Sequence, residues 1–263
     1  MRLSILHRTA YHFSEPQARL VQLLRVTPPD THDQTVADWR IDVDCDAKLR
    51  DGRDGWGNRV TMLYAEGPLD GLEIEISGEV LTTHSDGVLH GLTETLPPPV
   101  FLRATELTMP DAGIAAFVAE QAGETPLGTL HRLNAALHEQ FVFDRSRPAG
   151  LTAAAAFARG EATPRDVAHI FLVGARGLGV PARYVSGYSR LAGEHRPTPH
   201  GWAEAYIDGL GWVGFDSCTG LCPQDDHVRV AIALDAVGAA PIAGSRLGDG
   251  QERLDVEVRV AEA

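Results

Sequence analysis

Two polar residues in the last third of the chain, His200 and Asp216, have the types and the spacing of a base and a carboxylate that orients it. His200 opens the strand-like segment 200–206, and Asp216 closes the next such segment, 211–215. In an antiparallel pair, the start of one strand lies beside the end of the next, where a carboxylate can fix the tautomer of an imidazole. We therefore predict that His200 and Asp216 form a base–orienter pair. A surface histidine and a turn aspartate are the alternative, since both residues are common at strand ends.

The first 85 residues carry the signals of antiparallel β-structure. Segments 39–45 and 72–76 alternate apolar and polar side chains with period two, as half-buried strands require. Between them, residues 51–58 are rich in glycine, aspartate and asparagine, which is typical of turns. These patterns predict an N-terminal antiparallel β-sandwich.

A proline-containing connection at about residues 86–110 predicts a boundary between two units, because proline is excluded from helix interiors and central strands. We place the units at residues 1–95 and 96–263. Downstream, the spacing of apolar residues predicts helices at 112–122, 126–140, 151–159 and 165–178, followed by strands at 184–188, 202–206, 211–215, 228–232 and 254–260. This order predicts an α+β core that includes the C-terminal strands.

Composition and charge exclude several classes of protein. With 263 residues, 44% hydrophobic and 22% charged, the chain has the composition of a globular protein rather than a disordered or disulfide-stapled one. A net charge of -13 argues against nucleic acid or an anionic membrane as partner. No apolar run reaches the length of a membrane span or of a signal peptide, and three cysteines form no even framework. We therefore expect a cytoplasmic protein.

Several ordered motifs resemble the bacterial transglutaminase-like family. In the second half, the matching segments are Asp166-Val167-Ala168-His169, Gly179-Val180-Pro181-Ala182-Arg183-Tyr184-Val185-Ser186-Gly187-Tyr188, His200-Gly201-Trp202-Ala203-Glu204 and Gly211-Trp212-Val213-Gly214-Phe215-Asp216. In the first half, the segments His7-Arg8-Thr9-Ala10-Tyr11, Leu24-Arg25-Val26-Thr27-Pro28 and Asp54-Gly55-Trp56-Gly57-Asn58 resemble the β-rich region that precedes that family's core. The resemblance covers nearly the whole chain. It implies a papain-like core of helices packed on an antiparallel sheet.

The resemblance also implies a mechanism like that of papain. In that family a cysteine at a helix N-terminus is the nucleophile, a histidine is the base and an aspartate orients the histidine. His200 matches the histidine and Asp216 the aspartate. The segment Ala162-Thr163-Pro164-Arg165-Asp166-Val167-Ala168-His169 places Pro164 where the family has its cysteine.

Pro164 suits a helix start but not catalysis. Proline is well accepted in the first turn of a helix, and Thr163 followed by Asp166 three residues later has the pattern of a capping box. We therefore predict that the helix begins where the family's does. Proline removes both the thiol and the backbone N–H that papain-like enzymes offer to the oxyanion. Thr163 is not expected to replace the nucleophile, since its hydroxyl caps the helix.

Cys218, two residues after Asp216, is the alternative nucleophile, although an unreactive turn cysteine is the simpler interpretation. Cys218, Cys222 and His227 have the spacing C-x3-C-x4-H and lack a fourth ligand, so we expect no metal site and no cofactor. Tyr188 and Trp202 are candidates for the substrate cleft in the manner of the family, with buried core aromatics as the alternative.

Three other residues have structural interpretations. On an apolar helix face, we expect His169 to be a core histidine. Arg183 and Glu204 are candidates for an ion pair that supports the strands.

These observations favour a transglutaminase-like protein that lacks the catalytic cysteine and acts as a binding or scaffolding partner of a protein or peptide. The alternative is an active amide-bond hydrolase or acyltransferase, a peptidase or transamidase that uses His200 and Asp216 with a relocated nucleophile such as Cys218. The sequence leaves the oligomeric state and the identity of the partner open.

Overall fold

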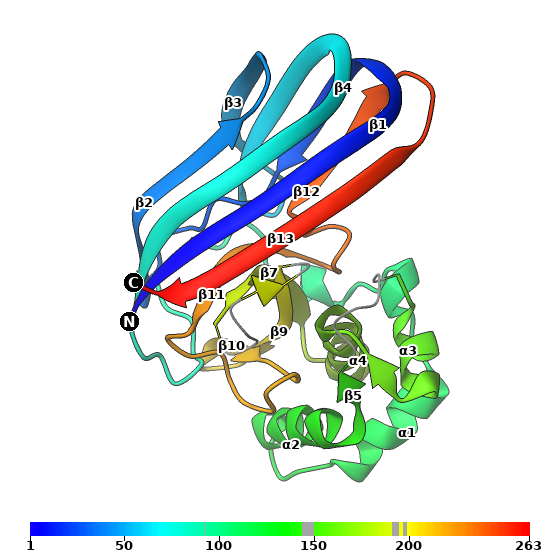
Figure 1. Ribbon diagram of the computed structural model, residues 1–263. Coiled ribbons are helices and arrows are strands. Elements are labelled where there is room, and N and C mark those ends of the chain that lie inside the picture. The colour runs from blue at the N-terminus through cyan, green and yellow to red at the C-terminus, as the bar shows by residue number, and fades with distance from the viewer. Residues whose placement is uncertain (92, 144–149, 191–194, 197–198) are drawn as a thin grey trace.

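The computed structural model describes residues 1–91, 93–143, 150–190, 195–196 and 199–263. It shows an antiparallel β-sheet region above a core of helices and a second antiparallel sheet (Figure 1). The first four strands are β1 (Arg2–Leu24), β2 (Gln34–Val43), β3 (Ala47–Arg53) and β4 (Arg59–Thr82). The predicted mixed α+β fold with an N-terminal antiparallel sheet is confirmed.

The N-terminal sheet is built on the long strands β1 and β4, which pair with each other along most of their length. Their register shifts between His12 and Arg19, and both strands turn back there (Figure 1). One apolar cluster consequently holds Leu20 and Leu63 from one half of the sheet with Leu72 and Ile74 from the other. The alternating pattern of β4 places these apolar side chains inside and its glutamates outside. The sheet thus folds over and encloses its own core.

The C-terminal strands β12 (Ile242–Leu247) and β13 (Glu252–Glu262) join this N-terminal sheet. β13 pairs with β1 from Leu3 to Phe13, and β12 pairs with β1 from Arg19 to Leu24. A further short strand, β8 (His195–Arg196), pairs with β13. The sequence analysis assigns the C-terminal strands to the core, whereas their hydrogen bonds go to β1. The division of the chain at residue 95 stays a prediction.

The core contains four helices and a sheet with the strand order β10-β9-β7-β11. The helices are α1 (Ala112–Glu120), α2 (Pro126–Gln140), α3 (Ala153–Arg159) and α4 (Pro164–Gly177), and the strands are β7 (Ala182–Ser189), β9 (His200–Ile207), β10 (Gly211–Phe215) and β11 (His227–Ala233). The short elements η1 (Pro98–Leu102), η2 (Glu106–Thr108), β5 (Val142–Phe143) and β6 (Glu161–Ala162) lie before or between the helices. All four predicted helices are present.

Helix α4 is the central helix of the core. Residues 166–175 of this helix are all buried, and they pack in one cluster with α2 and the face of β9 that carries Ala203 and Ala205. Helix α2 contributes Leu130, Leu133 and Leu137 to this cluster, as its apolar stripe predicts. This packing fixes the N-terminus of α4 relative to the β-sheet.

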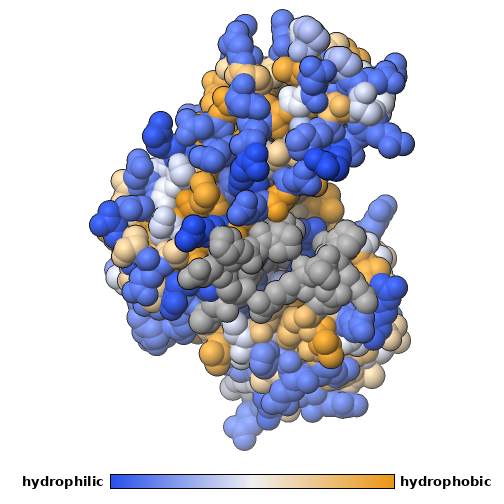
Figure 2. Space-filling view, in the orientation of Figure 1, coloured by the Kyte–Doolittle hydropathy of each residue, from blue (hydrophilic) through white to orange (hydrophobic). Residues whose placement is uncertain are grey.

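The two parts of the molecule share a packed boundary. Leu3 and Val80 of the N-terminal sheet pack against Tyr188 and Val228 of the core sheet in one cluster. Figure 2 shows that hydrophilic side chains cover most of one face of the molecule, and that hydrophobic ones show near the hollow between the two parts. None of the helices in the described segments is long and apolar enough to cross a membrane.

Candidate functional site

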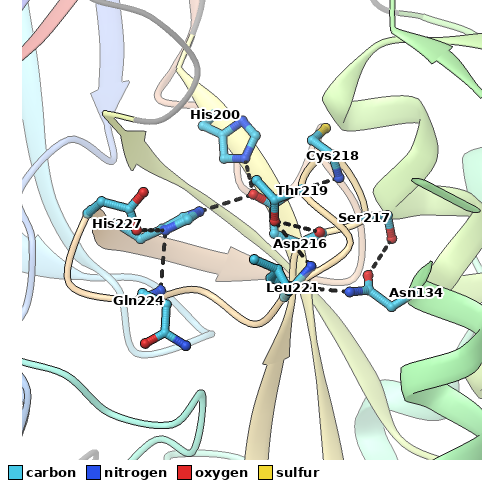
Figure 3. Close-up of polar contacts among 10 residues, drawn as sticks. Asn134, His200, Asp216, Ser217, Cys218, Thr219, Leu221, Gln224 and His227 are labelled. Atoms are coloured by element: carbon cyan, nitrogen blue, oxygen red, sulfur yellow. Dashed lines mark hydrogen bonds and ion pairs between the residues drawn. The ribbon is translucent and has the colours of Figure 1, made fainter. Parts of the chain in front are cut away.

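His200 and Asp216 form the predicted pair (Figure 3). The Nε2 atom of His200 lies 2.8 Å from Oδ2 of Asp216, and both side chains are almost completely buried. The last registered pair of β9 and β10 joins Ala203 to Phe215, so the two residues are diagonal neighbours across the strands rather than directly opposite. The predicted contact is confirmed, whereas a catalytic role for the pair stays a prediction.

Steric crowding explains why the residue after His200 is a glycine, Gly201. A methyl group on Gly201 would lie 1.9 Å from the hydroxyl oxygen of Tyr184, which is buried under α4. Since that phenol belongs to the same packed cluster as the helix, only glycine lets β9 run this close to β7 directly after His200.

A second histidine, His227, joins the pair and was not assigned to it from the sequence. Its Nε2 atom lies 3.0 Å from the same Oδ2 atom of Asp216, and its Nδ1 atom lies 2.8 Å from Oδ1 of Asp226. His227 opens β11, which pairs with β7 on the side of the sheet away from β10. The predicted strand 228–232 begins directly after His227, but no spacing in the sequence links that position to His200 and Asp216.

Asp216 is the centre of this network. Its Oδ1 atom accepts a hydrogen bond of 3.0 Å from the backbone N–H of Cys218. Burial alone would raise the pKa of the Asp216 carboxyl, but the charges and hydrogen bonds of His200 and His227 hold it far below its usual range. Asp216 therefore remains a carboxylate in the interior.

His227 carries the balancing positive charge. Burial lowers the pKa of its imidazole, but the hydrogen bonds and charges of Asp216 and Asp226 outweigh burial and raise the pKa to about 9. At neutral pH, His227 is an imidazolium that donates one N–H to each of the two carboxylates.

Pro164 is the first residue of α4, as the sequence predicts. The Thr163 hydroxyl accepts a hydrogen bond of 3.2 Å from the Asp166 N–H and donates one of 2.8 Å to Oδ2 of Asp166. Asp166 Oδ2 also accepts a hydrogen bond of 3.0 Å from the Thr163 N–H. This is the reciprocal capping box, and it uses the only proton of the Thr163 hydroxyl. The helix start thus offers neither a thiol nor a hydroxyl whose proton is free of the cap.

The cysteines differ in their surroundings. Cys218 is half-buried in the turn after Asp216 and contacts that residue through its backbone. Cys222 is half-buried as well, and burial raises the pKa of its thiol. Burial also raises the pKa of Cys45, which packs against the core of the N-terminal sheet. The role of Cys218 as an alternative nucleophile stays a prediction.

The two aromatic residues predicted for the cleft lie in different places. Tyr188 is buried between β7 and β1, where its hydroxyl lies 3.0 Å from Nδ1 of His7, which favours the interpretation as a core residue. Trp202 lies beside the polar network, with ring centroids 5.9 Å from His200 and 5.4 Å from His227.

Trp202 and His227 also line a cavity of about 70 Å³ at the boundary of the two parts. The core contributes Gln224 and Arg229 to its wall, and the N-terminal part contributes Gln34 and His90, among other residues. A substrate contact of Trp202 stays a prediction.

The predicted ion pair of Arg183 and Glu204 is confirmed, with 2.6 Å between Nε and Oε2. Arg229 binds the other oxygen of Glu204 at 2.7 Å, and Glu94 binds Arg183 at 2.8 Å. Burial would raise the pKa of Glu204, but Arg229 and Arg183 hold it below its usual value. The guanidinium of Arg183 also lies 3.7 Å from the ring centroid of Trp212. This buried network supports the strands that carry His200 and His227.

His169 is a core histidine, as predicted. Its Nε2 atom accepts a hydrogen bond of 3.0 Å from the backbone N–H of Ala236, while its Nδ1 atom has no partner among the residues described. Burial lowers the pKa of His169 to about 4. The ring is therefore neutral and structural.

One group of side chains brings three metal-ligating atoms together. The Nε2 atoms of His200 and His227 and a carboxylate oxygen of Asp216 lie within 4.8 Å of one another. The set weighed from the sequence, Cys218, Cys222 and His227, is not such a group in the described part of the chain.

Comparison with known protein families agrees with this architecture. Residues 3–81 match the bacterial transglutaminase-like N-terminal region, and residues 115–217 match the transglutaminase-like superfamily. The chain has a transglutaminase-like core. That matched segment contains Pro164, His200 and Asp216, whereas His227 lies beyond its end.

Two individual proteins resemble this transglutaminase-like chain over almost its full length. A crystal structure from Cytophaga hutchinsonii, described as a "putative cysteine protease", superposes with a TM-score of 0.77 at 19% identity and covers 99% of this chain and 90% of that one. The uncharacterized protein ML0607 of Mycobacterium leprae (strain TN) is 25% identical over 98% of both chains. The first similarity shows that the two proteins share a fold.

Proposed function

We propose that this protein is a catalytically inactive transglutaminase-like protein whose core binds a protein or peptide. The observation that carries the proposal is Pro164 at the first position of α4, where the family resemblance places the nucleophilic cysteine. Without a thiol at this helix start, no acyl-enzyme can form there.

The surroundings of Pro164 support the same conclusion. A proline has no backbone N–H, so it cannot donate to an oxyanion at this position. The neighbouring Thr163 hydroxyl already donates its proton to Asp166 at 2.8 Å. Activating it as a nucleophile would break the cap of α4. Pro164 and Thr163 therefore stabilise the N-terminus of α4 and supply no catalytic group.

The hydrogen bond between His200 and Asp216 does not by itself indicate turnover. Asp216 bonds to His200, to His227 and to the backbone of Cys218, so it joins the ends of three core strands. Such a network stabilises a fold without any reaction. A protein that binds without catalysing a reaction needs the shape of this core but not its nucleophile.

The competing function is an amide-bond hydrolase or acyltransferase that uses Cys218. The observation in its favour is the hydrogen bond from the Cys218 N–H to Asp216, which places this cysteine in the turn that carries the orienting carboxylate. Such an enzyme needs His200 to activate the relocated thiol.

Covalent labelling separates the two functions. The intact protein is treated at neutral pH with a glutamine-mimicking electrophilic peptide, and adducts are located by mass spectrometry in the wild type and in His200→Ala. We expect slow labelling that does not depend on His200. A fast adduct on Cys218 that disappears in His200→Ala would refute the inactive protein and establish the relocated nucleophile.

The variant Pro164→Cys provides the positive control. It places a thiol at the N-terminus of α4, where the helix dipole favours the thiolate and where the family's arrangement has the histidine base beside the cysteine. We expect fast labelling at this position in Pro164→Cys and a large reduction in Pro164→Cys combined with His200→Ala. A Pro164→Cys thiol that reacts no faster than Cys222 would show that proline is not the reason for inactivity.

A further inference from the structure

Three potential metal ligands converge from three separate segments of the core sheet. His200 opens β9, Asp216 follows β10 and His227 opens β11, and one oxygen of Asp216 lies 2.8 and 3.0 Å from the two Nε2 atoms. Figure 3 shows both imidazoles pointing toward this carboxylate. Because the three residues stand at strand ends of one sheet, the backbone holds the ligand atoms in place without an ion.

The donor set is that of a transition-metal site with an open position. Two imidazole nitrogens and one carboxylate are the protein ligands of many catalytic zinc sites, and they also suit other divalent first-row metals. Zinc bonds of about 2.0–2.1 Å in a tetrahedron place the ligand atoms about 3.3 Å apart. The observed 2.8 and 3.0 Å distances between Asp216 Oδ2 and the two nitrogens are a few tenths of an ångström shorter than this spacing, and all three ligand atoms lie within 4.8 Å of one another. Binding an ion therefore requires the two imidazoles to rearrange around it.

Hydrogen bonds from neighbouring groups orient these ligands, as they do in metal sites. His227 lies 2.8 Å through Nδ1 from Oδ1 of Asp226, which is the carboxylate–histidine arrangement that orients a metal-bound imidazole. The second oxygen of Asp216 is held by the Cys218 N–H at 3.0 Å. The outer oxygen of Asp226, a residue only 4% exposed, has no hydrogen-bond partner in the described part of the structure.

A cavity of about 70 Å³ lies beside one of the three ligand residues, His227. His227 and Trp202 line the cavity, and so does Gln224, whose Oε1 atom is buried without a partner among the described residues. A buried acceptor that lacks a donor is costly.

We propose that His200, Asp216 and His227 form a binding site for one divalent transition-metal ion of the zinc type. The ion takes the place of the proton that His227 Nε2 donates to Asp216, and this proton is released to solvent on binding. The donor atoms, the carboxylate behind His227 and the adjoining cavity are independent observations that agree on this site. The site does not depend on the proposed binding of a peptide, and it uses none of the cysteines.

The test uses the full chain, freed of metal with a chelator and titrated with zinc by calorimetry and with cobalt(II) by absorption spectroscopy. We expect one equivalent to bind per chain. We also expect the zinc-loaded protein to show a first shell of nitrogen and oxygen at about 2.0–2.1 Å, without sulfur, in X-ray absorption. Failure to bind one equivalent, or a sulfur ligand, would overturn the proposal.

Variants locate the site. His227→Ala is expected to remove stoichiometric binding, and Asp226→Asn, which keeps all three ligands, is expected to weaken it by about 10- to 100-fold. His84→Ala is the matched control, because His84 forms an exposed histidine–aspartate pair with Asp86 at 2.8 Å. Circular dichroism checks that each variant is folded. Binding that survives in folded His227→Ala and is lost in His84→Ala would assign the ion to the surface.

Discussion

Two buried neutral histidines, His7 and His169, are expected to make the fold sensitive to mild acid. Burial lowers the pKa of both imidazoles to about 4, from an unfolded value near 6.5. Since the folded pKa is the lower one, their contribution to stability is present above pH 6.5. It is lost as the pH falls toward 4, because the unfolded chain binds the protons first.

The magnitude follows from these pKa values. Between pH 7.5 and pH 5.0, each histidine lowers the free energy of unfolding by about 2 kcal/mol, so the pair lowers it by about 4 kcal/mol. The contacts of the two histidines also indicate that protonation destabilises the folded state. A proton on Nε2 of His169 would break the hydrogen bond from the Ala236 N–H, and a charge on His7 would lie in the packed boundary between the two sheets.

Urea unfolding at the two pH values measures this effect. His7→Gln and His169→Gln keep a hydrogen-bonding side chain but do not titrate, so each should reduce the difference between the two pH values by about 2 kcal/mol. If the double variant His7→Gln/His169→Gln loses as much stability at pH 5.0 as the wild type, the assignment of acid sensitivity to these residues is wrong.

Three further substitutions test the elements that hold the site, each by chemical denaturation. Thr163→Ala removes the hydroxyl that caps α4 and leaves the buried Asp166 carboxylate with only the backbone N–H of residue 163, at an expected cost of about 1–2 kcal/mol; no loss would show that the hydroxyl cap is dispensable. Glu204→Gln leaves the buried Arg183 and the partly buried Arg229 without their shared carboxylate, at an expected cost of about 3–5 kcal/mol, and a fully stable variant would contradict that role. Gly201→Ala forces a methyl group onto the Tyr184 hydroxyl and should cost about 1–3 kcal/mol, with wild-type stability as the contrary result.

The helices were predictable because their signals are local. The spacing of apolar residues and the Thr163–Asp166 box lie within one or two turns, and α2 and α4 follow the predicted ranges closely. The C-terminal strands were different. The pairing of β13 with β1 joins residues about 250 positions apart, such as Leu3 and Glu262, and no local pattern specifies that partner.

The same distinction applies to the site. The pair His200–Asp216 could be predicted because β9 and β10 are consecutive strands that form a hairpin. His227 could not be placed with them from spacing, because β11 reaches the site by pairing with β7 on the other side of β9. The position of His227 depends on the order of the strands in the sheet and not on their order in the sequence, so the structure is needed to place it.

The central position of Asp216 explains why the His200–Asp216 pair is compatible with a helix start that carries no thiol. Its carboxylate is buried and bonds at once to His200, His227 and the Cys218 N–H. Removing it would leave a buried imidazolium without its main counter-ion, which is among the costly changes for a protein interior. A cysteine at the start of α4 is not needed for stability in this way, because Pro164 fits a helix start at least as well as a cysteine does. Loss of the nucleophile is therefore compatible with the fold, while loss of the pair is not. Retention of His200 and Asp216 is expected whether the core catalyses a reaction, binds a peptide or holds a metal ion.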